Sequence, residues 1–104
     1  MQDASTTDGI DANVIIGAYA GDEFSGNAVA NTVIIGHTAA SAVMQSTASG
    51  TVAIGKSALA VLTSGDGNVA VGYQSGMALT DGQYNTLLGF EAGLSLDGGT
   101  SNVF

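Results

Sequence analysis

The chain contains no cysteine, no proline and almost no positive charge. Without cysteine it can form no disulfide bond, so cysteine usage does not indicate a redox compartment. Its 104 residues include nine Asp or Glu but only one Lys or Arg, Lys56, and the formal net charge is −8. Such an acidic chain has no electrostatic attraction to phosphate backbones or to anionic membrane surfaces. The charge balance therefore argues against nucleic acid and membrane surfaces as partners.

Charged residues of either sign are also scarce. They make up 10% of the chain, against roughly 25% in a typical soluble domain, whereas hydrophobic residues make up 45% and there are 16 glycines. This composition fits a tightly stacked sheet protein whose apolar surface is covered by other copies of itself. No apolar run approaches the length of a membrane span, and the N-terminus has neither a basic stretch nor a hydrophobic region. We therefore expect no membrane insertion within this segment.

A short apolar segment that ends in glycine occurs five times. Successive glycines lie 19, 19, 17 and 17 residues apart, a spacing typical of one structural unit stacked on itself. This repetition favours a scaffolding or binding role over catalysis. The five repeat-defining glycines are Gly17, Gly36, Gly55, Gly72 and Gly89.

The three residues before each glycine are apolar on both faces of the expected strand. Side chains alternate between faces along a strand, so the first and third residues share one face and the second points to the other. One face can fill the inside of a coil, but the other needs a covering layer, which five short coils do not supply. Self-association is the simplest source of that layer. The predicted core and trimer-packing residues are Val14, Ile15, Ile16, Val33, Ile34, Ile35, Val52, Ile54, Val69, Val71, Leu87 and Leu88.

Two further positions recur after the glycine. A small residue stands three positions after it and is expected at a narrow inward corner. A bulky apolar residue stands seven positions after it and predicts a second, outer strand that plugs the core. The small residues are Ala20, Ala39, Ala58, Ser75 and Ala92, and the bulky ones are Phe24, Val43, Leu62, Leu79 and Leu96.

A polar residue precedes every apolar triplet. Identical positions in stacked coils lie about 4.8 Å apart, so these side chains could form a hydrogen-bonded ladder along the stack. Alternatively, Asn simply favours the turn geometry before a strand. The residues are Asn13, Thr32, Thr51, Asn68, Asn85 and Asn102.

These patterns predict an all-β parallel β-roll or β-solenoid of about five coils, each 17–19 residues long. A repeat of 17 residues leaves no room for a crossover helix between parallel strands. Residues 13–104 form the expected repeat domain, and residues 1–12 are expected to be a frayed N-terminus and the end of a preceding coil. Asn102-Val103-Phe104 begins a sixth copy, so we expect the chain to be a fragment of a longer fibre.

The repeats resemble known fibrous proteins. Thr51-Val52-Ala53-Ile54-Gly55 and Asn68-Val69-Ala70-Val71-Gly72 resemble the YadA-like head repeats of trimeric autotransporter adhesins. Asn85-Thr86-Leu87-Leu88-Gly89 and the segment Gly89-Phe90-Glu91-Ala92-Gly93 are more similar in style to phage tail-fibre repeats. The resemblance covers roughly residues 13–104. It implies a left-handed β-roll, three chains around a common axis, and a location on a virion or a bacterial cell surface.

Residues for catalysis or metal binding are few. His37 is the only histidine, and it occupies a repeat position that varies between coils, which indicates a surface or interface residue. Asp22 and Glu23 are the only adjacent acids, and neighbours in a strand face opposite ways. The Gly- and Asp-containing turns do not recur in the register that a calcium-binding β-roll requires. We therefore expect no catalytic residue, no metal and no cofactor.

The sequence thus predicts a structural segment of a trimeric extracellular fibre. A phage tail fibre with host-surface or glycan attachment is the first hypothesis, and the head of a bacterial trimeric autotransporter adhesin is the second. A glycan-degrading, tailspike-like enzyme is the alternative from another functional class, with Asp22, Glu23 and Glu91 as the acids to examine. The expected partners are two further copies of the chain and a host receptor or glycan.

Overall fold

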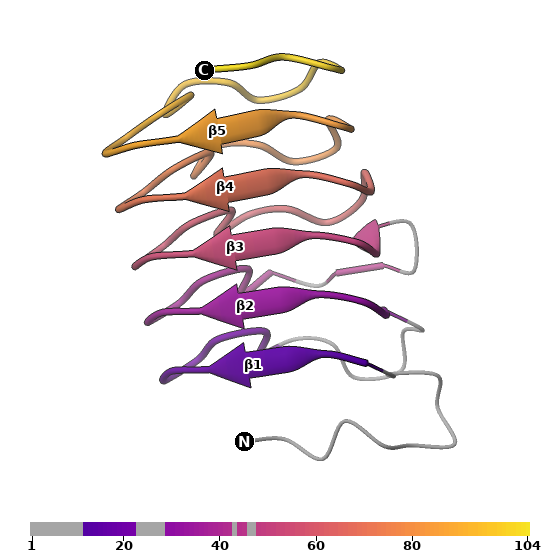
Figure 1. Cartoon of the computed structure of the whole chain (residues 1–104), viewed down its shortest axis with the longest axis vertical. Helices are drawn as coiled ribbons and strands as arrows, with labels where there is room; N and C mark the ends of the chain where they lie inside the picture. Colours follow the sequence, from indigo (N-terminus) through magenta and orange to yellow (C-terminus); the bar gives the residue numbers. More distant parts are fainter. Residues whose placement is uncertain (1–11, 23–28, 43, 46–47) are drawn as a thin grey trace.

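The computed structural model describes residues 12–22, 29–42, 44–45 and 48–104. They form a five-stranded parallel sheet in the order β1-β2-β3-β4-β5, with consecutive strands side by side (Figure 1). The strands are β1 (Val14–Ile16), β2 (Val33–Ile35), β3 (Val52–Ile54), β4 (Val69–Val71) and β5 (Thr86–Leu88). The predicted all-β solenoid is confirmed, with about four turns between β1 and β5 rather than five coils. The N-terminal segment expected at residues 1–12 lies, apart from Ala12, outside the described residues.

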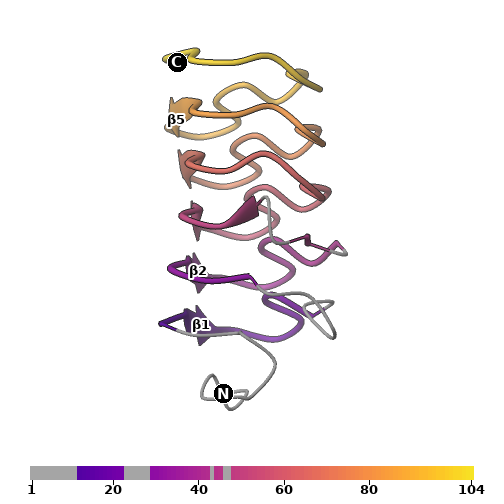
Figure 2. The same ribbon diagram turned by 90° about the vertical axis from the view of Figure 1, so that its right-hand side faces the viewer.

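Every strand pairs residue for residue with the equivalent triplet of the next coil. Val14 pairs with Val33 across a 19-residue step, and Val52 pairs with Val69 across a 17-residue step. The difference in coil length is therefore absorbed outside the strands. Seen from the side, the coils rise as parallel layers of one stack (Figure 2).

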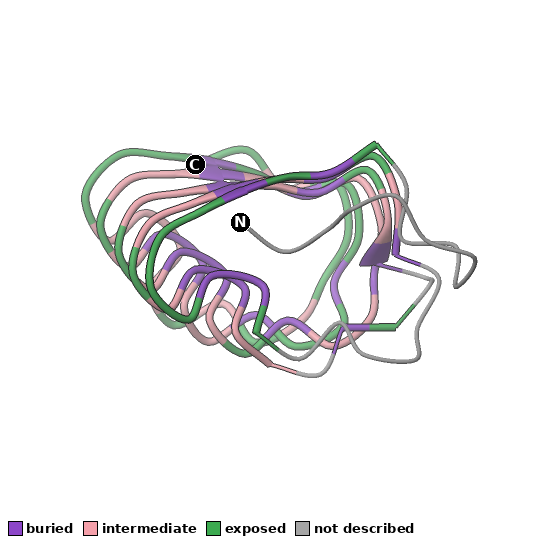
Figure 3. Cartoon of the chain, turned by 90° about the horizontal axis from the view of Figure 1, so that it is seen from below, coloured by how far each residue is buried: buried purple, intermediate pink, exposed green. Residues whose placement is uncertain are grey.

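The interior of the coil holds the central residue of each strand. Burial alternates along all five strands, with the central residue buried and its two neighbours partly or fully exposed (Figure 3). The small residues after the glycine also point inward as predicted, since Ala39, Ala58 and Ser75 are fully buried. The core consists of aliphatic side chains, among which the largest fully buried ones are Ile34, Met44, Leu59, Leu62, Leu79 and Leu87.

The predicted second strand is wrong, although its core residues are right. Leu62 and Leu79 are fully buried and Leu96 packs partly against the core, whereas Phe24 and Val43 lie outside the described residues. The backbone at this position forms tight turns, in which Leu62 N–H donates to Leu59 O and Leu79 N–H donates to Gly76 O. Residues with positive φ turn the backbone sharply just before these leucines, Leu59 with φ 51° and Gly76 with φ 60°. The chain therefore cannot extend into a strand here.

Each strand ends at a glycine whose backbone only glycine adopts without strain. The φ values at Gly17, Gly36, Gly55, Gly72 and Gly89 lie between 127° and 139°. A Cβ on Gly55 would lie 2.5 Å from the Gly72 carbonyl oxygen, because the corners stack directly on one another. The repeated glycine therefore sets both the direction of the chain and the closeness of the coils. Gly89 has the same φ of 127°, but a Cβ there would meet no atom within 4 Å.

The polar residues before the strands form a buried ladder, most completely in the last three coils. Asn68 Oδ1 accepts hydrogen bonds from Asn85 N (3.0 Å) and Asn85 Nδ2 (3.1 Å). Asn85 Oδ1 in turn accepts from Asn102 N and Asn102 Nδ2, both at 2.9 Å. Asn13 Oδ1 accepts from Thr32 in the same way, at 2.9 Å from its backbone nitrogen and 2.7 Å from Oγ1. The ladder is interrupted at Thr51, whose hydroxyl donates to Ala48 O within its own coil.

We expect Asn85→Ala to destabilise the stack by about 2 kcal/mol, because the truncation removes the four hydrogen bonds that the fully buried Asn85 amide group makes to the neighbouring coils. Asn85 Nδ2 donates to Gly99 O at 2.9 Å, and Asn85 Oδ1 satisfies the amide of Asn102. Urea unfolding at equal chain concentrations measures the effect. Asn102→Ala is the matched control and should cost about 1 kcal/mol or less, since Asn102 is only partly buried. Equal unfolding midpoints for Asn85→Ala and the parent chain would contradict the stabilising role of the ladder.

Candidate interaction surfaces

The outer side of the parallel sheet is the first candidate surface, here called the sheet face. It consists of the first and third side chains of each strand, which point away from the buried central residue. Val14 is 45% exposed, Ile16 53% and Leu88 67%, and the first and third residues of β2, β3 and β4 are partly buried. The full set is Val14, Ile16, Val33, Ile35, Val52, Ile54, Val69, Val71, Thr86 and Leu88.

The sheet face is aliphatic and uncharged along its whole length. Thr86 is its only polar side chain, although the chain as a whole carries nine acids. Contiguous apolar surfaces of this kind usually mark protein–protein or membrane contacts rather than free surface. The structure therefore divides the predicted packing residues in two: Ile15, Ile34 and Leu87 fill the coil itself, and the others remain outside it.

A second apolar strip is less regular than the sheet face. It includes Ala60, Met77 and Leu94, which are partly buried, and Val61, which is 41% exposed. The equivalent position is occupied by the exposed Asp22 in the first coil. Because its chemistry changes between coils, this strip is less suited than the sheet face to a partner surface that repeats the same side chains in every coil.

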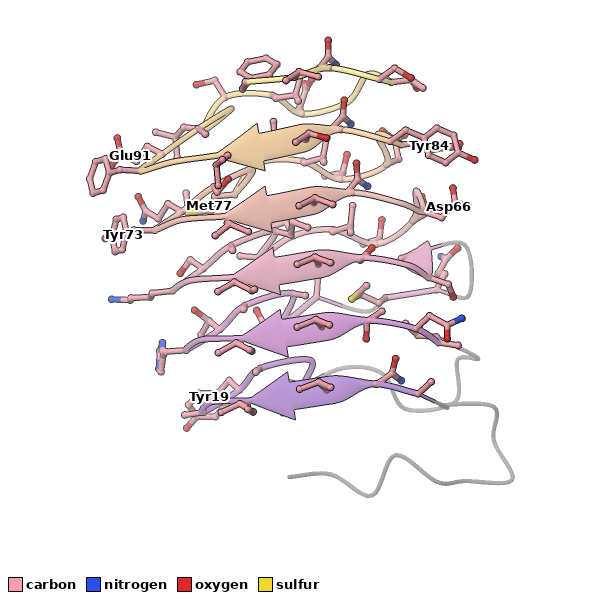
Figure 4. The ribbon with its side chains drawn as sticks, viewed as in Figure 1. Tyr19, Asp66, Tyr73, Met77, Tyr84 and Glu91 are labelled. Atoms are coloured by element: carbon pink, nitrogen blue, oxygen red, sulfur yellow. The ribbon has the colours of Figure 1, made fainter. Side chains whose placement is uncertain are left out.

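The corner that follows each glycine is the second candidate surface, here called the glycine corner. Tyr73 and Phe90 stack there, with ring centroids 5.3 Å apart and planes inclined by 10°. Tyr19 meets the His37 ring edge to face at 5.7 Å. Tyr19, Tyr73 and Glu91 lie along one edge of the stack, and Asp66 and Tyr84 lie at the opposite edge (Figure 4). The glycine corner comprises Ala18-Tyr19, His37-Thr38, Lys56-Ser57, Tyr73-Gln74 and Phe90-Glu91.

The groups considered for catalysis do not assemble into a site. Asp22 and His37 are exposed, Glu91 is half-buried at the glycine corner, and Glu23 lies outside the described residues. Among the described residues no three His, Cys, Asp or Glu side chains gather in a way that could hold a metal ion. The same part of the chain contains no helix long and apolar enough to cross a membrane.

Sequence reasoning missed the order within the glycine corner. It treated the positions after each glycine as variable surface, and it did not predict that Tyr73 and Phe90 stack. The available signal was the recurrence of rings one or two residues after the glycine, at Tyr19, His37, Tyr73 and Phe90. No protein-family model, curated protein or solved structure matches the chain.

Proposed function

We propose that this chain is a structural segment of a trimeric extracellular fibre, in which three sheet faces meet around a common axis. The observation that carries the proposal is the uncharged aliphatic sheet face, which stays partly exposed in a single chain although its inner counterpart is buried. Covering it stabilises an assembly by about 1 kcal/mol for each half-exposed aliphatic side chain. A second copy repeats the same side chains at the same strand spacing, so contact can be continuous along the stack.

The resemblance to trimeric fibre repeats supplies three features of this proposal: the trimer, the left-handed coil and the virion location. A trimer is also compatible with the shape of the sheet face. A three-fold ring needs two different surfaces on each chain that fit each other. The sheet face offers two parallel columns, one from Val14 to Thr86 and one from Ile16 to Leu88. Around the axis, the second column of each chain would lie nearest the centre, where its three copies meet, and would also contact the first column of the next chain.

Single cysteines introduced into this cysteine-free chain test the arrangement. Ile54→Cys places a thiol on the sheet face, and disulfide formation requires Cβ atoms about 3.5–4.5 Å apart. In a trimer one thiol of the three has no partner, so oxidation is expected to link at most about two thirds of the chains. A two-chain sandwich would allow all chains to link. Lys56→Cys, on the exposed glycine corner, is the matched control and should not link.

A phage tail fibre is the preferred source because the last two coils carry the tail-fibre-like pattern through Asn85 and Gly89. The head of a bacterial autotransporter adhesin is the second candidate, supported by the strand Val52-Ala53-Ile54-Gly55. A glycan-degrading enzyme is tested by incubating the chain with surface polysaccharides and measuring released reducing ends. Polysaccharide cleavage that Asp22→Asn, Glu23→Gln or Glu91→Gln abolishes would replace the structural role with an enzymatic one.

A further inference from the structure

The two exposed surfaces differ in chemistry. The sheet face is aliphatic and has no aromatic ring, whereas the glycine corner has three exposed aromatic rings and no branched aliphatic side chain. Phe90 is 72% exposed and Tyr19 63%, and all the aromatic side chains of the described residues lie outside the core. Aromatic residues normally dominate cores and interfaces because of the area they bury. Their position here indicates that the corner contacts something other than this chain's own core.

The backbone of the corner repeats from coil to coil. The second residue after each glycine has φ between 54° and 60° in all five coils, a left-handed conformation that favours Gly or Asn. The chain nevertheless keeps Tyr19, Thr38, Ser57, Gln74 and Glu91 there. Left-handed residues other than glycine also occur elsewhere in the coil, at Ala40 and the buried Leu59, so the conformation alone does not mark a contact residue. Because the same backbone conformation repeats in every coil, these five side chains leave the stack in the same direction and form one column along the glycine corner.

Hydrogen bonds between coils hold the corner rigid. Ser57 N donates to His37 O at 2.9 Å, and Gln74 N donates to Lys56 O at 2.9 Å. Thr38 Oγ1 and Ser57 Oγ lie 3.0 Å apart across two coils. The backbone that carries these side chains is already ordered, so its conformational entropy changes little when a ligand binds.

We propose that the glycine corner binds uncharged glycans, with Tyr19, Tyr73 and Phe90 as the aromatic contacts. The exposed parts of the rings can pack against the C–H groups of a sugar, and the neighbouring hydroxyl, amide and carboxylate groups of Thr38, Gln74 and Glu91 can donate to or accept from its hydroxyls. Hydroxyl, amide and carboxylate groups alternate with the rings along the corner, with no branched aliphatic side chain beside them, and this mixture suits sugar hydroxyls and C–H groups together. Acidic glycans are repelled by the net charge of −8. This inference deepens the proposed fibre function, since it assigns the surface that faces outward from the trimer.

An array of immobilised oligosaccharides tests the assignment, with neutral glycans, sialylated or uronic acid-containing glycans, and the bare carrier protein on one slide. We expect binding to neutral glycans, an at least tenfold loss with Phe90→Ala or Tyr73→Ala, and retention with Phe90→Tyr. Tyr84→Ala removes an exposed ring from the opposite edge and should change binding less than twofold.

Four results would overturn the proposal: binding to no glycan, binding to acidic glycans only, neutral-glycan binding unchanged by Phe90→Ala, or binding to the bare carrier protein that Phe90→Ala abolishes. The last result would make the corner a protein-docking surface. The mass of each variant in solution is measured on the same samples. A monomer that binds neutral glycans through Phe90 would contradict the fibre and support the glycan site, so the two proposals fail separately.

Discussion

Gly55→Ala is expected to prevent stable stacking of the coils, at a cost of at least about 4 kcal/mol. Alanine at φ 127° is strained by about 1–3 kcal/mol. Its Cβ would also lie 2.5 Å from the Gly72 carbonyl oxygen and 2.7 Å from the Gly72 carbonyl carbon, and these backbone atoms cannot give way as a flexible side chain does. A loss of this size is comparable to the whole stability of a small domain. Urea unfolding followed by circular dichroism measures it.

Gly89→Ala separates the clash from the backbone strain. Gly89 has the same φ of 127°, but a Cβ at this position meets no atom within 4 Å. Its substitution should therefore cost only the strain, about 1–3 kcal/mol. If the two variants lose the same stability, close stacking of the corners does not explain the repeated glycine.

Ile54→Lys is expected to dissociate the assembly into folded single chains. Ile54 lies on the sheet face in the middle strand, so three lysines would meet near the axis without partners. Burying an unpaired ammonium group costs several kcal/mol, and we expect the dissociation constant to rise by at least about 10³-fold. Lysine lowers the net negative charge of the chain, so a general increase in repulsion could not cause this dissociation. Sedimentation velocity and circular dichroism together distinguish dissociation from unfolding.

Val61→Lys is the matched control, because Val61 is 41% exposed and lies outside the sheet face. It should leave the assembly intact. If Val61→Lys dissociates the chains and Ile54→Lys does not, the second apolar strip is the interface and the proposed arrangement is wrong.

The sequence predicted the strands because both of their signals are local. Alternation fixes which side chains share a face, and the glycine fixes where each strand ends, so Ile15, Ile34 and Leu87 could be assigned to the packing of the stack. From the sequence, the buried ladder could be proposed, but it could not be distinguished from a simple preference of Asn for the turn before a strand. An Asn side chain serves either purpose, and only the positions of Asn68 and Asn85 in adjacent coils decide between them.

The second side of the coil could not be predicted in the same way. Leu62 and Leu79 are spaced as strand residues would be, yet the path between the glycine and these leucines depends on left-handed residues such as Ser57 and Leu59. Neither residue type signals a positive φ, because both normally avoid it. The stacking of Tyr73 on Phe90 likewise depends on ring orientations that the spacing of the repeat does not encode.

Sedimentation equilibrium of the unmodified chain tests the central claim most directly. The proposed trimer predicts a species of three times the 10.2 kDa mass of a single chain, stable to dilution through the micromolar range. A folded species of 10.2 kDa at the same concentrations would contradict the account, because the aliphatic sheet face would then be in contact with water.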